Sequence, residues 1–467
     1  MRPIIIIPIA MVLLELLSTL AISSSIKNFK KDFGAKGDGI SDDSEAWSRV
    51  ITHYNLHKGG TLIVPEGIYR VGAQKTNWNS RKDVNYSSPK YNTTLSEIDG
   101  LLIQGTLKGG KIVSIFKYLS GIKYGFFNPD TGTQGLDVTL SSHASPGTFL
   151  TLGWDCKNVI IKNLELDGNF SEANYKAAPK DMKGPDLTYS GIASYMARNV
   201  VIENVYAHHF GLDGIYIQTP REKLTPGKFH TTLSKVRSEY NGRQGLSFTV
   251  GSNLKVINSS FKYTGMGGIR ISPCANVDIE NHDNTGAPLA NSIFENCIIS
   301  SNQGGSGSVN IAGKVDNIHF KNCVIDAGPK IKDTNRIYSV QMNFSPSRNV
   351  SFDNCKLTGV FLMYQPGKKM DDDGFTLLKN CTITDNNVSN DIPETQPLID
   401  VYDQIKFDNC TFFVSPKRKF IRSSTFSKTE LSDAEDVTFK NCKVMNLKTR
   451  KTIPDIKARV TSNIKFR

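Results

Sequence analysis

A four-residue phrase that recurs six times in the second half of the chain limits the possible fold more than any other feature. Each copy ends in Asn-Cys after an apolar and a charged residue, and successive cysteines lie 26, 32, 26, 29 and 32 residues apart. A period of this length is typical of a repeat protein in which each repeat forms one coil. The six copies are FENC at 294–297, FKNC at 320–323, FDNC at 352–355, LKNC at 378–381, FDNC at 407–410 and FKNC at 439–442.

The pattern continues upstream without the cysteine, in VIIKN, VVIEN and LKVIN, which end at Asn163, Asn204 and Asn258. Apolar residues alternate before and after each Asn, which predicts a short strand, a polar turn and a second short strand. One such unit cannot bury its apolar side, but coils stacked in register can. We therefore predict an all-β, single-stranded solenoid of parallel strands, with one interior column of Cys, another of Phe or Ile, and an Asn column at a turn. The cysteines are then buried small hydrophobic residues rather than disulfides or metal ligands.

A glycine-rich stretch, DFGAKGDGISDDSEAW at 32–47, precedes the repeats. It lacks the Gly-Lys-Ser/Thr of a phosphate loop, and its acids do not follow the alternation of a calcium loop. Asp42 is instead a suitable N-cap residue, with Glu45 three residues later. Apolar residues then recur at helical spacing, which predicts an amphipathic α-helix that caps the open end of the solenoid. These residues are Ala46, Trp47, Val50, Ile51 and Tyr54.

This stretch, followed by GGTLIVPEGIYRV at 59–71, resembles the opening of the pectate-lyase-like right-handed parallel β-helix superfamily, which includes rhamnogalacturonase, polygalacturonase and epimerase-like members. The resemblance implies a right-handed parallel β-helix and a carbohydrate-active function. It does not separate hydrolases, lyases, epimerases and phage tailspikes, because these share the fold. We expect a signal peptide at 1–23, an N-terminal cap with the amphipathic helix at 24–60, and the β-helix at 61–467.

The N-terminus has the order of charge, apolar core and small residues that is typical of a secretory signal. Arg2 precedes an apolar run at 4–22, which is interrupted by Glu15 and followed by three serines. We expect a secreted or periplasmic protein with no later membrane span, and a monomer. The formal net charge of +12 fits an anionic polysaccharide as the partner. No nucleic-acid-binding motif is present, so we expect no nucleic-acid partner.

Three coils align without gaps, because ten residues separate Asn204 from Gly214, and the same spacing recurs from 235 to 245 and from 258 to 268. Strand side chains alternate between two faces, so this alignment predicts two exposed columns. One column is Glu165, Tyr206, Arg237 and Ser260, and the other is Asp167, His208, Glu239 and Lys262. Asp213, Tyr216, Arg243, Gln244 and Arg270 are expected just beyond the turn that follows these columns.

Alternating charges of this kind could form a solvated surface of weak salt bridges. The second interpretation, which we pursue, is the polar floor of a substrate cleft at 165–270. The acid or base roles are then assigned to Asp167, His208, Asp213 and Glu239. The substrate contacts are assigned to Glu165, Tyr206, Tyr216, Arg237, Arg243, Gln244, Lys262 and Arg270.

The comparison with polygalacturonases limits the chemistry. Where those enzymes have Asn-Thr-Asp, Asp-Asp, Gly-His and Arg-Ile-Lys, this chain has TYS at 188–190, LD at 212–213, RQ at 243–244 and RIS at 270–272. Asp213 and Arg270 match, whereas the other acids, the His and the Lys do not. Glycosidic hydrolysis, which uses two carboxyl groups, keeps a slight lead because of Asp213. β-Elimination, C5 epimerisation of a uronate and non-catalytic glycan binding remain alternatives. No cofactor or metal ligand is predicted, although a lyase could use Ca²⁺.

Overall fold

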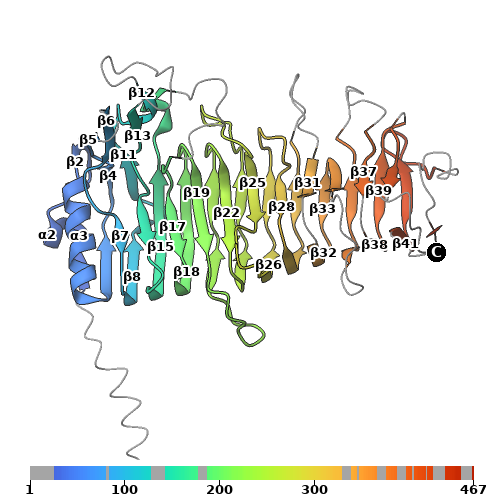
Figure 1. The fold of residues 1–467 in the computed structure, drawn as a ribbon, viewed down its shortest axis with the longest axis horizontal. Coiled ribbons are helices and arrows are strands. Elements are labelled where there is room, and N and C mark those ends of the chain that lie inside the picture. The colour runs from blue at the N-terminus through green and yellow to red at the C-terminus, as the bar shows by residue number, and fades with distance from the viewer. Residues whose placement is uncertain are drawn as a thin grey trace, which may run out of the picture.

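The computed structural model describes residues 26–79, 84–127, 142–176, 187–328, 338–343, 347–364, 375–386, 396–401, 404–416, 418–423, 437–453 and 465–466. The predicted signal peptide lies outside these residues. The described chain forms the predicted right-handed parallel β-helix, an elongated solenoid whose coils follow one another from the N-terminal to the C-terminal end (Figure 1). None of the helices in this part of the chain is long and apolar enough to cross a membrane.

One sheet contains 25 of the described strands, and its strand pairs are parallel. Its strands are β1 (Ile26–Asn28), β2 (Asp38–Asp42), β3 (Gly60–Val64), β4 (Gly67–Val71), β8 (Asp99–Gly105), β11 (Ser114–Tyr118), β15 (Lys157–Asp167), β18 (Arg198–His208), β20 (Thr231–Ser234), β21 (Arg237–Glu239), β23 (Leu254–Ile257), β24 (Ser260–Lys262), β26 (Leu289–Glu295), β27 (Ile298–Ser300), β29 (Val315–Lys321), β30 (Val324–Asp326), β32 (Ser347–Asp353), β33 (Lys356–Thr358), β35 (Thr376–Lys379), β36 (Thr382–Thr384), β38 (Ile405–Asp408), β39 (Thr411–Val414), β41 (Val437–Lys440), β42 (Lys443–Asn446) and β43 (Lys465–Phe466).

A second parallel sheet of 11 described strands forms another wall of the solenoid. Its strands are β7 (Thr94–Leu95), β14 (Leu150–Leu152), β17 (Ile192–Tyr195), β19 (Asp213–Gln218), β22 (Gln244–Val250), β25 (Ala275–Glu280), β28 (Val309–Ala312), β31 (Tyr338–Asn343), β34 (Val360–Tyr364), β37 (Ile399–Val401) and β40 (Ile421–Ser423). Smaller sheets are formed by β5 (Gln74–Asn79), β6 (Val84–Pro89), β12 (Lys123–Phe127), β13 (Ser142–Ala144) and β16 (Asn174–Lys176), and by β9 (Leu107–Lys108) with β10 (Lys111–Ile112).

The interior contains the predicted columns. Phe294, Phe320 and Phe352 are fully buried, and successive rings are stacked with centroids 4.8 Å apart. All eight cysteines are free thiols, and those at 297, 323, 355, 381 and 410 are buried. The prediction of small buried residues is therefore confirmed for these five, whereas Cys442, in the last copy of the phrase, is partly exposed.

The predicted Asn column lies at the turn between the two strands of each coil. Asn322 has a left-handed backbone, with φ of 54°, and its side-chain amide donates to Asn296 Oδ1 at 3.1 Å. Asn354 donates to Asn322 Oδ1 at 2.7 Å in the same way. Asn tolerates a left-handed backbone better than most residues, and the stacked amides satisfy one another along the solenoid axis.

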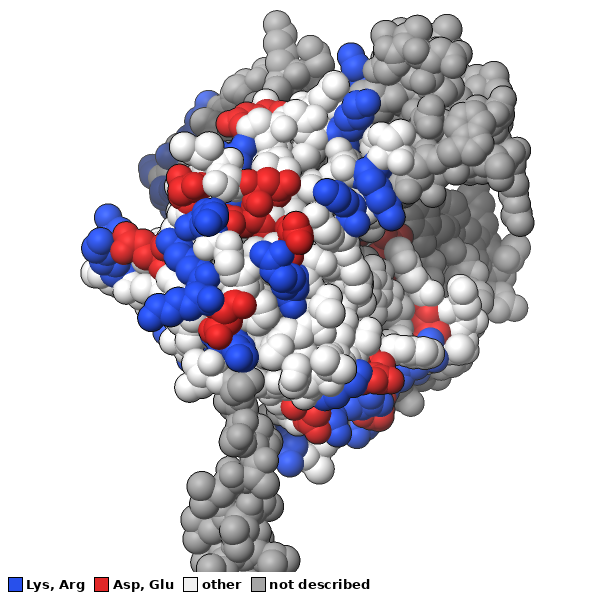
Figure 2. All heavy atoms as spheres, turned by 90° about the vertical axis from the view of Figure 1, so that its left-hand side faces the viewer, with Lys and Arg blue, Asp and Glu red and all other residues white. Residues whose placement is uncertain are grey.

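The N-terminal end carries α2 (Phe29–Phe33) and the predicted amphipathic helix, α3 (Ser44–His57). The apolar face of α3 is buried as expected, from Ala46 to Tyr54, and both helices lie at the first coils (Figure 1). The N-cap residue is Asp43 rather than Asp42, and Asp43 does not cap the helix with its side chain. Its carboxylate instead accepts from the backbone N–H groups of Lys36 and Gly37, which fixes the glycine-rich loop. Basic and acidic side chains are interspersed on this end of the molecule (Figure 2).

The gap-free alignment of three coils is correct for the first strand of each coil but wrong for the second strand of the third coil. Asp213 pairs with Gln244, and Ile215 pairs with Leu246, as predicted. Gln244 and Leu246 then pair with Ala275 and Val277, so that the next strand begins after Arg270. The chain between β24 and β25 is therefore an insertion, and its Gly-Ile-Arg-Ile phrase only imitates a strand of the repeat.

Candidate functional site

The first part of the candidate site is the pair of exposed columns, and their predicted register is confirmed. Asp167 pairs with His208, His208 with Glu239, and Glu239 with Lys262. The neighbouring column follows the same pairs of strands, from Glu165 through Tyr206 and Arg237 to Ser260. The rungs are therefore about 4.8 Å apart along each column. We call these residues the column site.

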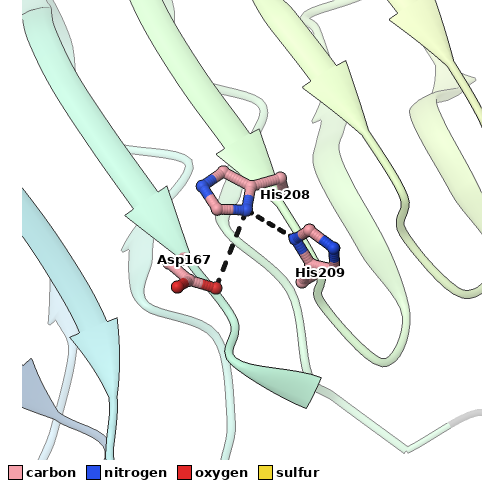
Figure 3. Close-up of side chains that lie close together, drawn as sticks. All are labelled: Asp167, His208 and His209. Atoms are coloured by element: carbon pink, nitrogen blue, oxygen red, sulfur yellow. Dashed lines mark hydrogen bonds and ion pairs between the residues drawn. The ribbon is translucent and has the colours of Figure 1, made fainter. Parts of the chain in front are cut away.

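His208 is the most enclosed polar residue of the column site, with a side chain only 9% exposed. Its Nδ1 lies 2.7 Å from Nδ1 of His209 and 3.7 Å from Oδ1 of Asp167 (Figure 3). Its Nε2 lies 3.5 Å from Oε1 of Glu165. Within the described chain this buried Nε2 has no hydrogen-bond partner. The imidazole is thus surrounded by a carboxylate on each side and a second imidazole.

Glu239 lies next to His208 in its column, but its carboxylate accepts hydrogen bonds from two residues of the neighbouring column. Its carboxylate accepts from the Tyr206 hydroxyl at 3.3 Å and from Ser260 Oγ at 3.2 Å. Burial, together with the nearby negative charge of Glu239, raises the pKa of Tyr206. The guanidinium of Arg237 lies over the Tyr206 ring, 3.9 Å from its centroid. Arg237, predicted to bind substrate, is thus held by an aromatic ring of its own column.

Lys117 belongs to the column site although the sequence did not suggest it. It pairs in register with Asp167 at the end of β11, and its Nζ lies 3.1 Å from Asp167 Oδ2. No Asn marks the turn of this early coil, so the spacing rule that aligned later coils could not find it. A cation therefore lies beside the carboxylate that we predicted as an acid or base.

Asp213 begins β19 in the second sheet, so the structure divides the predicted site between two walls of the solenoid. A Cβ on Gly214 would meet Ser238 Oγ in the interior at 2.0 Å, so the preceding Asp213 points outward. Ile215 and Ile217 are fully buried in the core, which places Tyr216 on the outer face. Asp213 is nevertheless fully buried by its partners. Arg243 donates from Nε and Nη2 to its two carboxylate oxygens at 2.9 and 2.6 Å.

A network of buried polar side chains extends from this ion pair along the outer face of the second sheet. Ser247 donates to Asp213 at 3.1 Å and also to Gln244, and Gln244 donates to Asp278. Asp278 also accepts from Asn310 at 2.7 Å. Burial, with the charge of Glu280 as a smaller cause, raises the pKa of Asp278 to about 7. We call Asp213, Arg243, Gln244, Ser247 and Asp278 the β19 site.

Two tyrosines lie beside the β19 site. Tyr195 at the end of β17 is 37% exposed, and its ring centroid lies 5.5 Å from that of Tyr216. Burial raises the pKa of Tyr195, and the charges of Tyr216, Asp213 and Arg243 also act on it. The Tyr216 hydroxyl accepts from Gln218 and Thr249, each at 2.8 Å. Tyr195 therefore lies at the surface against Tyr216, and the charges of the ion pair act on it from nearby.

Arg270 was predicted to lie on the strand beside β22. It lies instead in the insertion before β25, where it is exposed. The alignment gave the outward position beside Ser247 to Arg270. The residue that occupies this position is Asp278, which pairs with Ser247. The alternation in ANVDIE at 275–280 is the signal that could have identified it. Sequence reasoning missed His209 because side-chain alternation applies only within a strand. His209 follows the last residue of β18, and its left-handed backbone, with φ of 54°, turns the chain.

Comparisons with known proteins add the following findings. No protein-family model matches the chain. Mannuronan C5-epimerase AlgE6 of Azotobacter vinelandii is 26% identical over 199 residues, which cover 39% of this chain and 19% of that protein. Mannuronan C5-epimerase AlgE4 of the same organism is 24% identical over 199 residues, which cover 39% of this chain and 31% of that protein. The chain thus spans less than a third of the length of these relatives.

Two solved structures share the architecture. The A-module of AlgE4 superposes with a TM-score of 0.51 at 13% identity, covering 91% of this chain and 96% of the A-module. The N-terminal fragment of bacteriophage Phi29 gene product 12 gives a TM-score of 0.50 at 12% identity, covering 96% of this chain and 75% of the fragment. At these identities the likeness is one of fold, and it agrees with the parallel β-helix that the repeats predict.

Proposed function

We propose that the chain is an enzyme that acts on a uronate-containing polysaccharide by removing the proton at C5, beside the carboxylate. This step is shared by C5 epimerisation and β-elimination, and it replaces hydrolysis as the reaction that we favour. The relatives with detectable sequence similarity are mannuronan C5-epimerases, and the whole A-module of one of them has this fold. The net charge of +12 suits an anionic polymer.

The observation that carries the proposal is the Asp213–Arg243 pair beside Tyr195. When the C5–H bond breaks, its electron pair spreads into the uronate carboxylate, so a fixed cation near that carboxylate lowers the barrier. Arg243 is held by both oxygens of Asp213 and its side chain is 19% exposed, which suits it to bind the substrate carboxylate. The proton removed from C5 passes to a base, and His282, half exposed just after β25 and 3.2 Å from Glu280, offers an imidazole for that role. Tyr195, whose pKa is raised mainly by burial, stays protonated and can deliver its own proton to C5.

In this proposal Asp213 is a positioning residue rather than the acid of a hydrolase. Its carboxylate is fully buried and bound by Arg243 and Ser247, so it is poorly placed to activate water. The assignment of Asp167, His208 and Glu239 to acid or base roles stays a prediction. The three lie together in the column site, on the other sheet.

Hydrolysis is the second candidate, and Asp278 is the observation that favours it. Hydrolases pair a protonated carboxyl group with an ionised one, and environments that separate two carboxyl pKa values identify such pairs. The raised pKa of Asp278, about 7, makes it a proton donor near neutral pH, and Gln244 and Ser247 connect it to Asp213. Against this role, both its carboxylate oxygens accept from amides and the residue is only 1% exposed.

The test is incubation of the purified protein with mannuronan, pectic, sulfated algal and glycosaminoglycan polymers. New reducing ends, ultraviolet absorbance of unsaturated ends and the C5 configuration are measured on each polymer. Epimerisation changes the configuration alone, elimination gives both new ends and absorbance, and hydrolysis gives new ends without absorbance. Binding to a polymer with none of these changes would identify a non-catalytic glycan-binding β-helix.

We also propose that residues 1–23 direct export and are then removed. The apolar run after Arg2 supports this, and the serines at 23–25 supply the small residues of a cleavage site. Mass spectrometry of the protein recovered from its natural source gives the test. A mature N-terminus near Ser24 supports export, whereas an intact Met1 contradicts it.

A further inference from the structure

We propose that Asp167, His208 and His209 form a binding site for one divalent transition metal ion, with Zn²⁺ the best match to these ligands. In the described chain their ligand atoms all lie within 4.8 Å of one another, and the three side chains converge on one point (Figure 3). Two imidazoles and a carboxylate are a donor set that suits Zn²⁺ and its neighbours rather than Ca²⁺ or Mg²⁺. The sequence did not predict a metal site. The proposal of a metal site does not depend on which substrate the chain binds.

The backbone explains how two adjacent histidines come to face each other. His208 is the last residue of β18 and points outward beside Asp167, its neighbour in register. An extended His209 would point to the opposite face. Its left-handed conformation turns the chain instead, and this places the two Nδ1 atoms 2.7 Å apart. Tyr240 and Tyr263 occupy the same left-handed position on the next coils.

The hydrogen bonding of the pair is compatible with a metal ion held by the two Nδ1 atoms. A hydrogen bond between two Nδ1 atoms needs a proton on one of them and a lone pair on the other. If His209 supplies the proton, Nδ1 of His208 accepts it, and the proton of His208 lies on Nε2, beside the Glu165 carboxylate. If both Nδ1 atoms bind a metal ion, Nε2 of His208 carries the proton and can donate to Glu165, 3.5 Å away. This gives the carboxylate–histidine–metal arrangement that is usual in metal sites.

The surrounding side chains hold the three ligands in place. The Tyr206 ring stacks on His208 with centroids 4.2 Å apart, and the Tyr240 ring stacks on His209 at 5.1 Å with planes 6° apart. Lys117 holds Oδ2 of Asp167 at 3.1 Å, and the backbone N–H of Asn169 donates to Oδ1 at 2.7 Å. Such second-layer contacts orient the ligands before the ion binds. Three protein ligands leave a fourth position of a tetrahedral site for water. His208 and Asp167 would then be ligands rather than an acid and a base.

The test uses untagged full-length protein from which metals have been removed with a chelator. Isothermal titration with Zn²⁺ is expected to show one ion per chain, and Co²⁺ is expected to give the visible absorption of a tetrahedral site. His209→Asn is the main variant, because Asn tolerates the left-handed backbone and therefore preserves the turn. We expect it to weaken Zn²⁺ binding by more than about 100-fold, and Glu165→Gln to weaken it by about 10-fold, as is typical of second-layer changes.

His57→Ala is the matched control, because His53 and His57 on α3 are also neighbouring histidines, with ring centroids 4.1 Å apart. This variant is expected to bind Zn²⁺ as the wild type does. Asp167→Asn provides a second test if His209→Asn fails to fold. The proposal is refuted if Zn²⁺ does not saturate at one ion per chain, or if His209→Asn and Asp167→Asn bind it unchanged. Binding that His57→Ala removes would place the ion on the helix and would also refute it. None of these measurements depends on enzymatic activity, so the outcome is separate from that of the proposed function.

Discussion

Two regions of the solenoid use the same coil in different ways. In the ladder region, residues 289–446, successive coils repeat the same residue at the same place: Phe on Phe, Cys on Cys and Asn on Asn. In the central coils, residues 157–282, the interior is equally apolar, but the outward positions change from rung to rung. The column from Asp167 to Lys262 has an acid, an imidazole, an acid and an ammonium group.

This contrast indicates which part of a repeat protein carries function. Identical neighbours satisfy one another, so stability explains the repeated Phe, Cys and Asn residues of the ladder region. The central coils place a buried ion pair, a carboxyl group with a raised pKa and two adjacent histidines on the outer face, where the core does not need them. Polar groups that are buried without serving the core are expensive, and they tend to mark functional sites.

The largest expected effect is on the stability of the ladder region. Phe320 is fully buried between two stacked rings, so Phe320→Ala should lower the free energy of unfolding by about 3–5 kcal/mol. Val324→Ala, at a position that is 39% exposed on the next strand, should change it by less than about 0.5 kcal/mol. Urea unfolding of both variants gives the measurement. Equal losses of unfolding free energy in the two variants would contradict the assignment of position 320 to the interior and position 324 to the surface. Activity per folded molecule should be unchanged in both.

The second prediction compares buried ion pairs from the two regions. Asp400 is bound by Arg422 in the ladder region much as Asp213 is bound by Arg243, with distances of 2.8 and 2.5 Å. Asp213→Asn should reduce activity at least about 100-fold, because Arg243 loses its fixed position. Asp400→Asn should leave activity unchanged. Both should lose stability on the order of 1–3 kcal/mol, because a buried hydrogen-bonded charge loses its partner. Unfolding curves and initial rates of the two variants are compared. Equal activities of Asp213→Asn and Asp400→Asn would place the active site away from the β19 site.

The third prediction concerns pH. The pKa of Asp278 is raised from the ordinary value of 3.8 to about 7, mainly by burial. Between these pH values the folded chain keeps a proton that the unfolded chain releases, so this group's contribution to stability is full below pH 4 and falls as pH rises toward 7. The slope is at most about 1.4 kcal/mol per pH unit. In Asp278→Asn this contribution to the slope should be absent. Parallel stability profiles of variant and wild type from pH 4 to 8 would contradict the assignment.

Much of this architecture follows from periodicity. The spacing of the turn residues Asn163, Asn204, Lys235 and Asn258 predicted the register of β15, β18, β21 and β24, and side-chain alternation then placed both columns on the outer face. Periodicity failed where an insertion imitates the repeat, as at Gly268 to Ile271, and Arg270 was misassigned for that reason. Periodicity also could not predict which side chains contact each other. Nothing in the spacing indicates that Arg243 binds Asp213 through both oxygens, or that His209 turns back toward His208.

The central claim is that the central coils remove the C5 proton of a uronate, and its most direct test follows that hydrogen. Mannuronan, the polymer named in the relatives, is incubated with the protein in D₂O, and the product is analysed by NMR. If the central coils remove this proton, the original C5 hydrogen is lost, with deuterium in its place or with an unsaturated end. Asp213→Asn is then expected to stop this loss, and Asp400→Asn is not. New reducing ends on residues that keep their C5 hydrogen would contradict the account and establish hydrolysis.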